Sequence, residues 1–435
     1  MQAAYFPIAL ARGVPLLHRT IKGTNATRRG IVAQVDFDWY PKRQLSSLDI
    51  KRAARRIVLP RPHRDASVCF ESQPLVVAGM FRTANGLGQS ARACFQALKS
   101  SGLDPVAVDL SETLNQVDYE TSDALSSMPR ASRGTLILHA NAPETEAALT
   151  ALGLRRWHDW RIVGYWAWEL TQAPESWLRL TRHLSEIWTP SQFVTDAFRE
   201  KVDIPVRTVP HFVTTPERLN TERQGGDELR CLVMADGRSS FHRKNVVGAV
   251  SMFRHAFDCG ENATLTLKFR NLREYPEFSN TLRAIIKDDE RVTIVDENLD
   301  QTDKWNLIND SDILISAHRS EGFGLHMAEA MASGSCVIAT GWSGNMEYMN
   351  EHNSILLPYR LQPASDPYRV YQSVTDAEWA EVETEAGIEA LRALADCPDR
   401  RLTIGDAARR SVRATLTTDP YISALQNKPQ GDIRP

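Results

Sequence analysis

Two series of short apolar segments, each separated from the next by a longer stretch with helical spacing, constrain the fold of this chain most. Strands that alternate with helices form parallel βαβ units in a doubly wound sheet. The first series has candidate strands at residues 75–79, 106–108, 135–138, 161–164, 186–188 and 206–209. The second has them at residues 231–234, 264–267, 292–295, 313–315 and 336–339. The sequence therefore predicts an α/β protein with two Rossmann-like domains and a cleft between them.

Shifts in composition divide the chain further. A polar stretch that contains Pro216 and Gly225 indicates a linker between the two predicted domains. The predicted parts are an N-terminal extension, a first domain, the linker, a second domain, and a C-terminal helix and tail, at residues 1–70, 71–215, 216–228, 229–400 and 401–435. Helices are expected at residues 378–394 and 403–416. A chain of 435 residues is long enough for two hydrophobic cores.

The overall charge and the cysteines argue against several classes of protein. The formal net charge of −3 does not suit a general nucleic-acid binder, which needs a basic surface. The six cysteines are scattered and form no CxxC pair, so buried thiols are expected, with no metal and no cofactor. The chain has no run of about 18 apolar residues, and its N-terminus is a poor match to a signal peptide. A cytoplasmic protein is therefore expected.

A basic run from Lys51 to Arg56 lies in the N-terminal extension, and Arg61, His63 and Arg64 follow it. A cationic face of this kind can rest on anionic lipid headgroups, which would bring the protein to the inner face of the membrane. The plainer interpretation is a solvated helix face followed by a linker. The sequence leaves both interpretations open.

Two glutamates flank a glycine-containing loop in the second domain. Glu321 precedes Gly322 and Gly324, and glycines let the backbone approach a ligand closely. A helix is expected to begin near Leu325, and its N–H groups and positive dipole end would favour a phosphate. Glu329, about one turn into the helix, can accept hydrogen bonds from a ribose diol, while Glu321 can hold sugar hydroxyls. A helix with an acidic first turn and no ligand is the alternative.

A basic loop follows the first predicted strand of the second domain. It carries Arg238, Arg243 and Lys244 at the carboxyl end of that strand, where ligands of parallel sheets bind. Such a loop suits a diphosphate leaving group, because neutralising the charge that develops on a leaving group lowers the barrier to its departure. A solvated basic loop is the alternative.

Two segments of the first domain also follow predicted strands. Gly86 and Gly88 lie between a strand and a helix, where a plain turn is the alternative to a ligand-facing loop. Trp166 and Glu169 follow the strand at residues 161–164. An aromatic face beside a carboxylate suits sugar binding at the edge of the cleft, and packing of the tryptophans in the core is the alternative.

With these motifs, the sequence resembles the retaining, GT-B fold glycosyltransferases of group 1 (family 4). The most specific part is the Glu-x7-Glu motif from Glu321 to Glu329. Further segments are similar to a branch that acts on bacterial polysaccharides, and these are His318–Leu325, Ala339–Asn345, Gly164–Glu169 and Arg243–Asn245. The resemblance covers about residues 75 to 425. It implies transfer of a hexose, of mannose or glucose type, from a nucleotide diphosphate sugar to a polysaccharide or lipid-linked oligosaccharide acceptor, with retention of configuration.

The resemblance also implies roles for individual residues of the second domain. Glu321 would hold the hydroxyls of the donor sugar, and Glu329 would bind the ribose. Lys244 and Arg238 would be the diphosphate-binding pair, with Arg243 as the adjacent alternative to Arg238. The backbone that would line the sugar and phosphates belongs to Gly322, Phe323, Gly324 and Leu325. The base would lie near Asp296, and neither a metal nor an enzyme nucleophile is implied.

On the acceptor side, Gly86 and Gly88 match the glycine loop that faces the phosphate and the acceptor. Many members of the family place a histidine near the transferred sugar after a strand of the first domain, and this sequence has none at that point. The candidates for the missing contact are His139, Trp166 and Glu169. Two DxD triplets, at residues 36–38 and 310–312, are interpreted as structural rather than metal-binding.

Two other functions fit the same scaffold. A sugar phosphorylase or a nucleotide-sugar epimerase would use a similar two-domain cleft without a saccharide acceptor. A non-catalytic assembly subunit would bind the sugar nucleotide without turnover. Assays of donor hydrolysis and of acceptor dependence separate these alternatives from a transferase.

Overall fold

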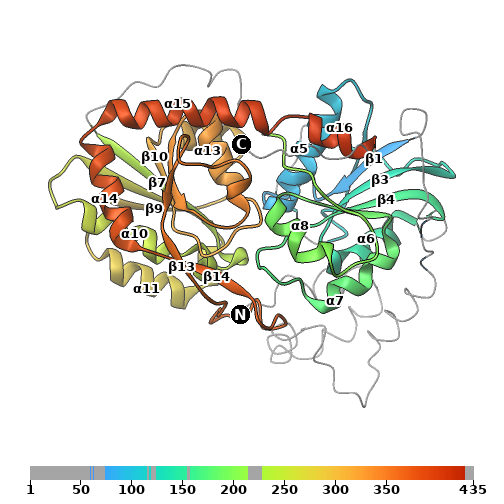
Figure 1. Ribbon diagram of the computed structural model, residues 1–435, viewed down its shortest axis with the longest axis horizontal. Coiled ribbons are helices and arrows are strands. Elements are labelled where there is room, and N and C mark those ends of the chain that lie inside the picture. The colour runs from blue at the N-terminus through green and yellow to red at the C-terminus, as the bar shows by residue number, and fades with distance from the viewer. Residues whose placement is uncertain are drawn as a thin grey trace, which may run out of the picture.

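The computed structural model describes residues 59, 62, 74–114, 117–118, 124–153, 157–213 and 228–426. The basic run, nearly all of the predicted N-terminal extension and linker, and the predicted tail beyond residue 426 lie outside these residues. Figure 1 shows two α/β domains side by side, each built on one sheet with helices packed against it. The predicted fold class, two Rossmann-like domains of the GT-B type, is confirmed.

The first domain contains a parallel sheet with the strand order β2-β1-β3-β4-β5-β6. Its strands are β1 (Leu75–Gly79), β2 (Val106–Asp109), β3 (Arg133–His139), β4 (Asp159–Tyr165), β5 (Glu186–Thr189) and β6 (Val206–Thr208). Its helices are α5 (Gly86–Ser100), α6 (Ala142–Gly153), α7 (Glu175–Leu178) and α8 (Gln192–Arg199), with the 3-10 turn η1 (Arg179–His183). Each strand predicted for this domain is present. Strands β1 and β5 are buried along their whole length, and β3 and β4 at all but their first residue, because a doubly wound sheet is covered on both faces.

The second domain contains a parallel sheet with the order β12-β11-β10-β7-β8-β9. Its strands are β7 (Leu229–Asp236), β8 (Ala263–Arg270), β9 (Val292–Asp296), β10 (Ile313–Ser316), β11 (Cys336–Thr340) and β12 (Ile355–Leu357). Its helices are α9 (Phe241–Lys244), α10 (Val246–Ala256), α11 (Pro276–Ile286), α12 (Gln301–Asn309), α13 (Leu325–Ser333) and α14 (Thr384–Ala395), with the turns η3 (Gly237–Ser239), η4 (Leu272–Glu274) and η5 (Gly344–Glu347). The strand order reverses between β7 and β10, and ligands of such sheets bind at that point.

An antiparallel hairpin of β13 (Tyr359–Pro363) and β14 (Glu378–Val382) corrects the helix expected at residues 378–394. We call residues 359–382 the arm. The helix begins only at Thr384, because pairing with β13 and burial of Trp379 outweigh the weak helical propensity of the preceding residues. The side chains of Tyr371 and Trp379 in the arm join the hydrophobic core of the first domain. The arm therefore connects the two domains.

The chain also returns to the first domain at its C-terminal end. Helix α15 (Pro398–Thr415), which contains the helix predicted at 403–416, runs along the second domain, and α16 (Asp419–Leu425) lies on the first (Figure 1). The Arg161 guanidinium donates to the carbonyls of Ala424 and Leu425 at the end of α16. Helix α16 was not expected, because seven residues are too few to show a clear periodicity. None of the described helices is both long enough and apolar enough to span a bilayer.

Candidate active site

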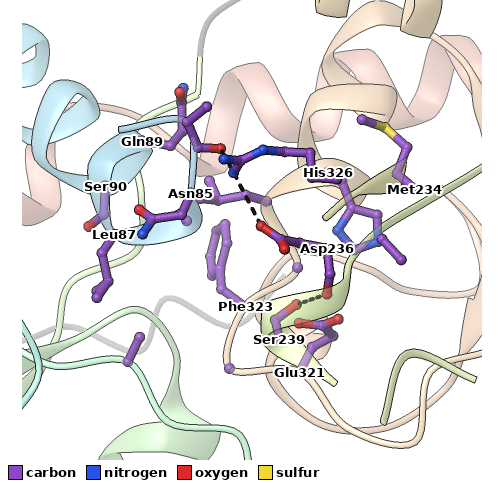
Figure 2. Close-up of a pocket in the computed structure, with 18 of the residues that line it drawn as sticks. Asn85, Leu87, Gln89, Ser90, Met234, Asp236, Ser239, Glu321, Phe323 and His326 are labelled. Carbon is purple, nitrogen blue, oxygen red and sulfur yellow. Dashed lines mark hydrogen bonds and ion pairs between the residues drawn. The ribbon is translucent and has the colours of Figure 1, made fainter. Parts of the chain in front are cut away.

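A cavity of about 400 Å³ lies between the two domains, at the carboxyl ends of both sheets. Its volume is in the range of small-molecule sites. In Figure 2, Asn85, Leu87, Gln89 and Ser90 of the first domain face residues of the second domain across the cavity. The predicted site residues that line it are Gly86, Glu169, Arg238, Arg243, Lys244, Glu321, Gly322, Phe323, Gly324, Leu325 and Glu329. The structure thus brings most of the predicted site together.

Two predicted acceptor-side residues are in the core and do not line the cavity. His139 is fully buried, stacks on Tyr165 and shares a 2.8 Å hydrogen bond between its Nδ1 and Ser90 Oγ. Trp166 is fully buried against Trp177 and Phe198. The geometry gives no support to a direct sugar contact by either side chain, because a ligand in the cavity does not reach the core.

Gly88 and Asp296 also lie off the cavity lining. A Cβ at Gly88 would stand 2.3 Å from the carbonyl oxygen of Thr83, so this glycine lets α5 pack against the loop before it. Asp296 ends β9 and accepts a 3.1 Å hydrogen bond from the backbone N–H of Leu272. Asp296 was predicted to lie near the base. In the structure, Leu299 of the loop that follows it lines the cavity instead.

The loop before α13 is held by close backbone contacts that only glycine permits. Gly344 approaches the loop so closely that a Cβ there would stand 2.1 Å from the Gly322 carbonyl oxygen. The backbone N–H of Gly344 donates to the Glu321 carbonyl at 2.8 Å. From the first domain, Ser191 Oγ donates to the Gly322 carbonyl at 2.6 Å. Both domains therefore fix the backbone that the resemblance assigns to the donor sugar.

The Glu321 carboxylate is buried and lies between two cations of the basic loop. Its Oε2 is 3.1 Å from Arg243 Nη1, and its Oε1 accepts a hydrogen bond from Lys244 Nζ. Burial alone would raise the pKa of Glu321, but the charges of Arg243 and Lys244 outweigh burial and hold the pKa well below its usual value. The carboxylate is therefore ionised and an acceptor for hydroxyl groups at neutral pH.

Arg243, rather than Arg238, shares Glu321 with Lys244. The Arg238 guanidinium lies at the cavity wall, where Nε and Nη2 form a two-point pair with Glu274 at 3.0 and 2.5 Å. Arg243 is 1% exposed and also donates to the carbonyls of Ser239 and Ser320. Of the two alternatives for the partner of Lys244, the geometry favours Arg243.

The second glutamate of the motif has a partner that the sequence did not indicate. Glu329 Oε1 lies 2.5 Å from Lys304 Nζ of α12, and both residues line the cavity. Only one oxygen of the carboxylate is used by this pair, so the other is available to a ligand. Lys304 was missed because it lies at an ordinary helical position after β9, and nothing in its neighbours in sequence marks it.

Helix α13 begins at the cavity with the geometry expected for an anion site. Gly324 has a φ of 84°, a left-handed conformation that favours glycine, and precedes the first turn of the helix. Leu325 and His326 of that turn line the cavity. Burial lowers the pKa of His326 to about 3, so this imidazole is neutral at pH 7. The free N–H groups of the first turn and the dipole thus supply positive charge there.

The first domain contributes a smaller polar face. Glu169 is half-buried, and its Oε1 lies 4.0 Å from Arg243 Nη2. Burial raises the pKa of Glu169, while the charge of Arg243 opposes that effect. Asn141 and His211 also line this face. Of the three sugar-contact candidates from the sequence, Glu169 is the one that the structure places in the cavity.

Lys268 and Arg270 of β8 also line the cavity, and sequence reasoning missed both. One feature of the strand could have indicated Lys268. In the run from Thr264 to Arg270, polar side chains alternate with buried Leu265, Leu267 and Phe269. A strand inside a doubly wound sheet is covered on both faces, so a lysine such as Lys268 is unusual there and indicates a ligand or a polar partner.

Among the described residues, no cluster of three His, Cys, Asp or Glu side chains could hold a metal ion.

Comparison with known proteins finds one family profile that matches part of the second domain. Residues 244–366 match the sequence profile described as "Glycosyl transferases group 1", a stretch that includes Lys244 and both glutamates of the motif. No curated protein matches the chain. The chain therefore combines a GT-B fold with a segment, residues 244–366, that is similar to group 1 glycosyltransferases.

Solved structures share the fold at low sequence identity. HepE from Anabaena, in complex with UDP and glucose, aligns with a TM-score of 0.55 and 13% identity over 82% of this chain and 97% of HepE. A glycosyltransferase from Rickettsia africae aligns with a TM-score of 0.53 and 16% identity over 81% of this chain and 97% of its own. A TarM variant from S. aureus, crystallised with UDP among other ligands, gives 0.50 and 10% over 68% of this chain. That alignment spans 55% of the TarM chain, so this protein matches about half of it.

Proposed function

We propose that this protein is a group 1 glycosyltransferase that moves a hexose from a nucleoside diphosphate sugar to a saccharide or lipid-linked acceptor, with retention of configuration. The observation that carries the proposal is the convergence of Lys244, Glu321 and the N-terminus of α13 on one cavity. These groups supply positive charge for a diphosphate and a carboxylate for sugar hydroxyls within the same space.

The donor would lie along the wall formed by the second domain. Its diphosphate would accept hydrogen bonds from the first turn of α13 and from Lys244, and these groups would stabilise the charge that the diphosphate gains as it leaves. Glu321 would receive the hydroxyls of the sugar, and Arg243 would hold that carboxylate in place. The free oxygen of Glu329 would accept a hydroxyl of the ribose.

The acceptor would enter from the side of the first domain. Glu169, Asn141 and His211 line the cavity there, opposite the Glu321 loop. The complexes of HepE and TarM with UDP support a nucleotide donor, since both proteins share this fold. A polysaccharide or lipid-linked oligosaccharide is the proposed acceptor class, on the resemblance of the segments after β4 and β10 to enzymes of polysaccharide synthesis.

Variants of two cavity residues test the proposal. Lys244→Met and Glu329→Gln each remove one group assigned to the donor while keeping side-chain size, so transfer of labelled hexose to extracted saccharide acceptors is expected to fall by at least about 100-fold. Glu389→Gln removes an exposed carboxylate of α14 and should retain full activity. Circular dichroism and thermal melting establish that each variant folds.

The products separate the alternatives. Full transfer by both folded variants would contradict the assigned site. Release of free sugar and nucleotide without an acceptor would indicate an epimerase-type reaction. Formation of sugar phosphate from saccharide and phosphate would indicate a phosphorylase, and tight donor binding with no product would indicate a binding subunit.

A further inference from the structure

Lys268 is a buried cation of the cavity wall that the proposed function leaves without a role. It lies on β8 and is 5% exposed. Its Nζ donates to the carbonyl oxygens of Phe269 and Glu297, at 2.7 and 2.6 Å. Among the described residues it has no carboxylate partner, in contrast to Lys244 and Lys304, which pair with glutamates.

An ammonium group has three N–H donors, and two of those of Lys268 are satisfied by carbonyls. The third is available at the cavity. Keeping a charged side chain out of water without a carboxylate in direct contact is unfavourable, so a position of this kind is expected to serve a ligand that accepts a hydrogen bond. The remaining question is which part of the donor lies there.

The strand order places Lys268 at the nucleoside end of the donor. The phosphate-binding groups follow β10, through α13, and β7, through Lys244. Strand β8 lies beyond β7 on the side away from β10. The Glu297 carbonyl that Lys268 contacts follows the edge strand β9, and Leu299 of the same loop lines the cavity. A donor whose diphosphate lies at α13 and whose ribose reaches Glu329 therefore extends its base toward β8 and β9.

We propose that Lys268 donates a hydrogen bond to an exocyclic keto oxygen of the donor base, so that the enzyme takes uracil or guanine nucleotides and discriminates against adenine. This inference rests on the proposed function. Guanine and uracil present a keto oxygen, which accepts a hydrogen bond, where adenine presents an amino group, which donates one. An ammonium that can only donate meets the oxygen favourably and leaves the amino group unpaired.

The charge state of Lys268 agrees with this role. Burial, and to a smaller extent the charge of Arg270 on the same strand, lower the pKa of Lys268 to about 8. Glu297, Asp296 and Asp236, on the neighbouring strands and loop, oppose this shift. The side chain is charged at pH 7 and loses its proton as the pH rises through 8. Affinity for a keto base is therefore expected to weaken between pH 7 and pH 9.

Binding of nucleoside diphosphates to the full-length protein tests the inference. Isothermal titration with UDP, GDP, ADP and pyrophosphate is compared for the wild type and for Lys268→Met. The wild type is expected to bind UDP or GDP at least about tenfold more tightly than ADP. In K268M, affinity for the preferred nucleotide should fall ~10- to 100-fold, while the affinities for ADP and pyrophosphate stay within about threefold. Lys99→Met, at an exposed position of α5, is the matched control and should leave all four unchanged.

The outcomes distinguish failure of this inference from failure of the proposed function. Tightest binding of ADP by the wild type, or an equal loss for all nucleotides in K268M, overturns the base contact but leaves a nucleotide donor in place. Absence of binding of any nucleoside diphosphate to the wild type overturns both. If K268M does not fold, Lys268→Arg takes its place. It keeps the charge and should keep the preference for a keto base, and a K268R protein that binds ADP as tightly as UDP and GDP contradicts the inference.

Discussion

At the scale of single residues, the site depends on one buried cluster of charges. Glu321 is the only carboxylate within ion-pair distance of Lys244 among the described residues, and it also pairs with Arg243. Removing one member of a buried pair leaves the other charge without a counter-ion, which is strongly destabilising. The same cluster therefore supports the fold around the cavity as well as the proposed donor site.

The pH dependence of stability follows from the sign of the shift. The pKa of Glu321 is lower in the folded protein than its ordinary value of 4.5 because Arg243 and Lys244 outweigh burial. Its contribution is therefore fully present above the unfolded pKa and is lost as the pH falls through the folded pKa. Glu321→Gln is expected to lower the free energy of unfolding by about 3 kcal/mol at pH 7.

Urea unfolding between pH 7 and pH 3.5 measures this difference. It should be constant above about pH 5.5 and shrink below pH 4.5, because the Glu321 carboxylate of the unfolded wild-type chain then takes up a proton while that of the folded protein stays ionised. The exposed Glu389→Gln should stay within about 0.5 kcal/mol of the wild type throughout. A difference between E321Q and the wild type that grows toward acid pH would contradict this account.

At the scale of elements, the arm contacts and supports the basic loop on the side away from the cavity. The backbone N–H of Ala380 in β14 donates to the Arg319 carbonyl at 2.8 Å, and the N–H of Arg319 donates to the Arg243 carbonyl at 2.7 Å. The Arg319 guanidinium pairs with Glu381 of the arm at 2.7 Å. Contacts therefore run from β14 through Arg319 to the residue that holds Glu321.

Trp379 is expected to be the main stabilising side chain of the arm. It is 1% exposed and packs against His242, with the Arg319 guanidinium over its ring. Trp379→Ala should lower the free energy of unfolding by about 3–5 kcal/mol, because a large buried side chain is lost. It should also raise the KM for the donor, since His242 adjoins Arg243. Leu361→Ala, at an exposed position of β13, is the control for denaturant unfolding and kinetics, and equal stabilities of the two variants would contradict the proposed role.

At the scale of the whole molecule, polar contacts across the cavity hold the two domains together. Arg270 of β8 donates to the Ala84 carbonyl at 2.6 Å and pairs with Asp118 of the first domain at 2.9 Å. The arm and α16 add apolar contacts on other sides. The relative position of the domains therefore depends on Arg270, on the Ser191 hydrogen bond to the Gly322 carbonyl, and on the packing of the arm and α16.

Asp118→Ala tests the contribution of the Arg270 contact to closure. The variant is expected to have a larger radius of gyration by small-angle X-ray scattering in the absence of ligand, because Arg270 loses its ionic partner in the first domain. Saturating nucleotide should reduce the difference if the donor bridges the domains. Asp399→Ala, exposed at the start of α15, is the control, and an unchanged radius for D118A would show that the Arg270–Asp118 pair does not set the domain positions.

Much of the fold followed from local patterns in the sequence. All strands of the two sheets except β12 were predicted, because an apolar run between helical stretches is a local signal. The Glu321 to Glu329 motif was placed because strand, glycine loop and helix are contiguous. The sequence also located the basic loop from Arg238 to Lys244, but it did not show which of the two arginines acts together with Lys244. Two arginines five residues apart could both pair with the same carboxylate, and only their folded positions show that Arg243 reaches Glu321 while Arg238 pairs with Glu274.

The sequence by itself determined the two α/β domains, the position of the cleft and the donor-side motif, since each depends on residues that are close in the chain. The tertiary structure alone decided which of the candidates line the cavity. His139 and Trp166 are in the core, whereas Lys268, Arg270 and Lys304 are at the cavity wall. Burial and pairing are long-range properties: they depend on what the rest of the chain packs against a side chain, and no local spacing records that.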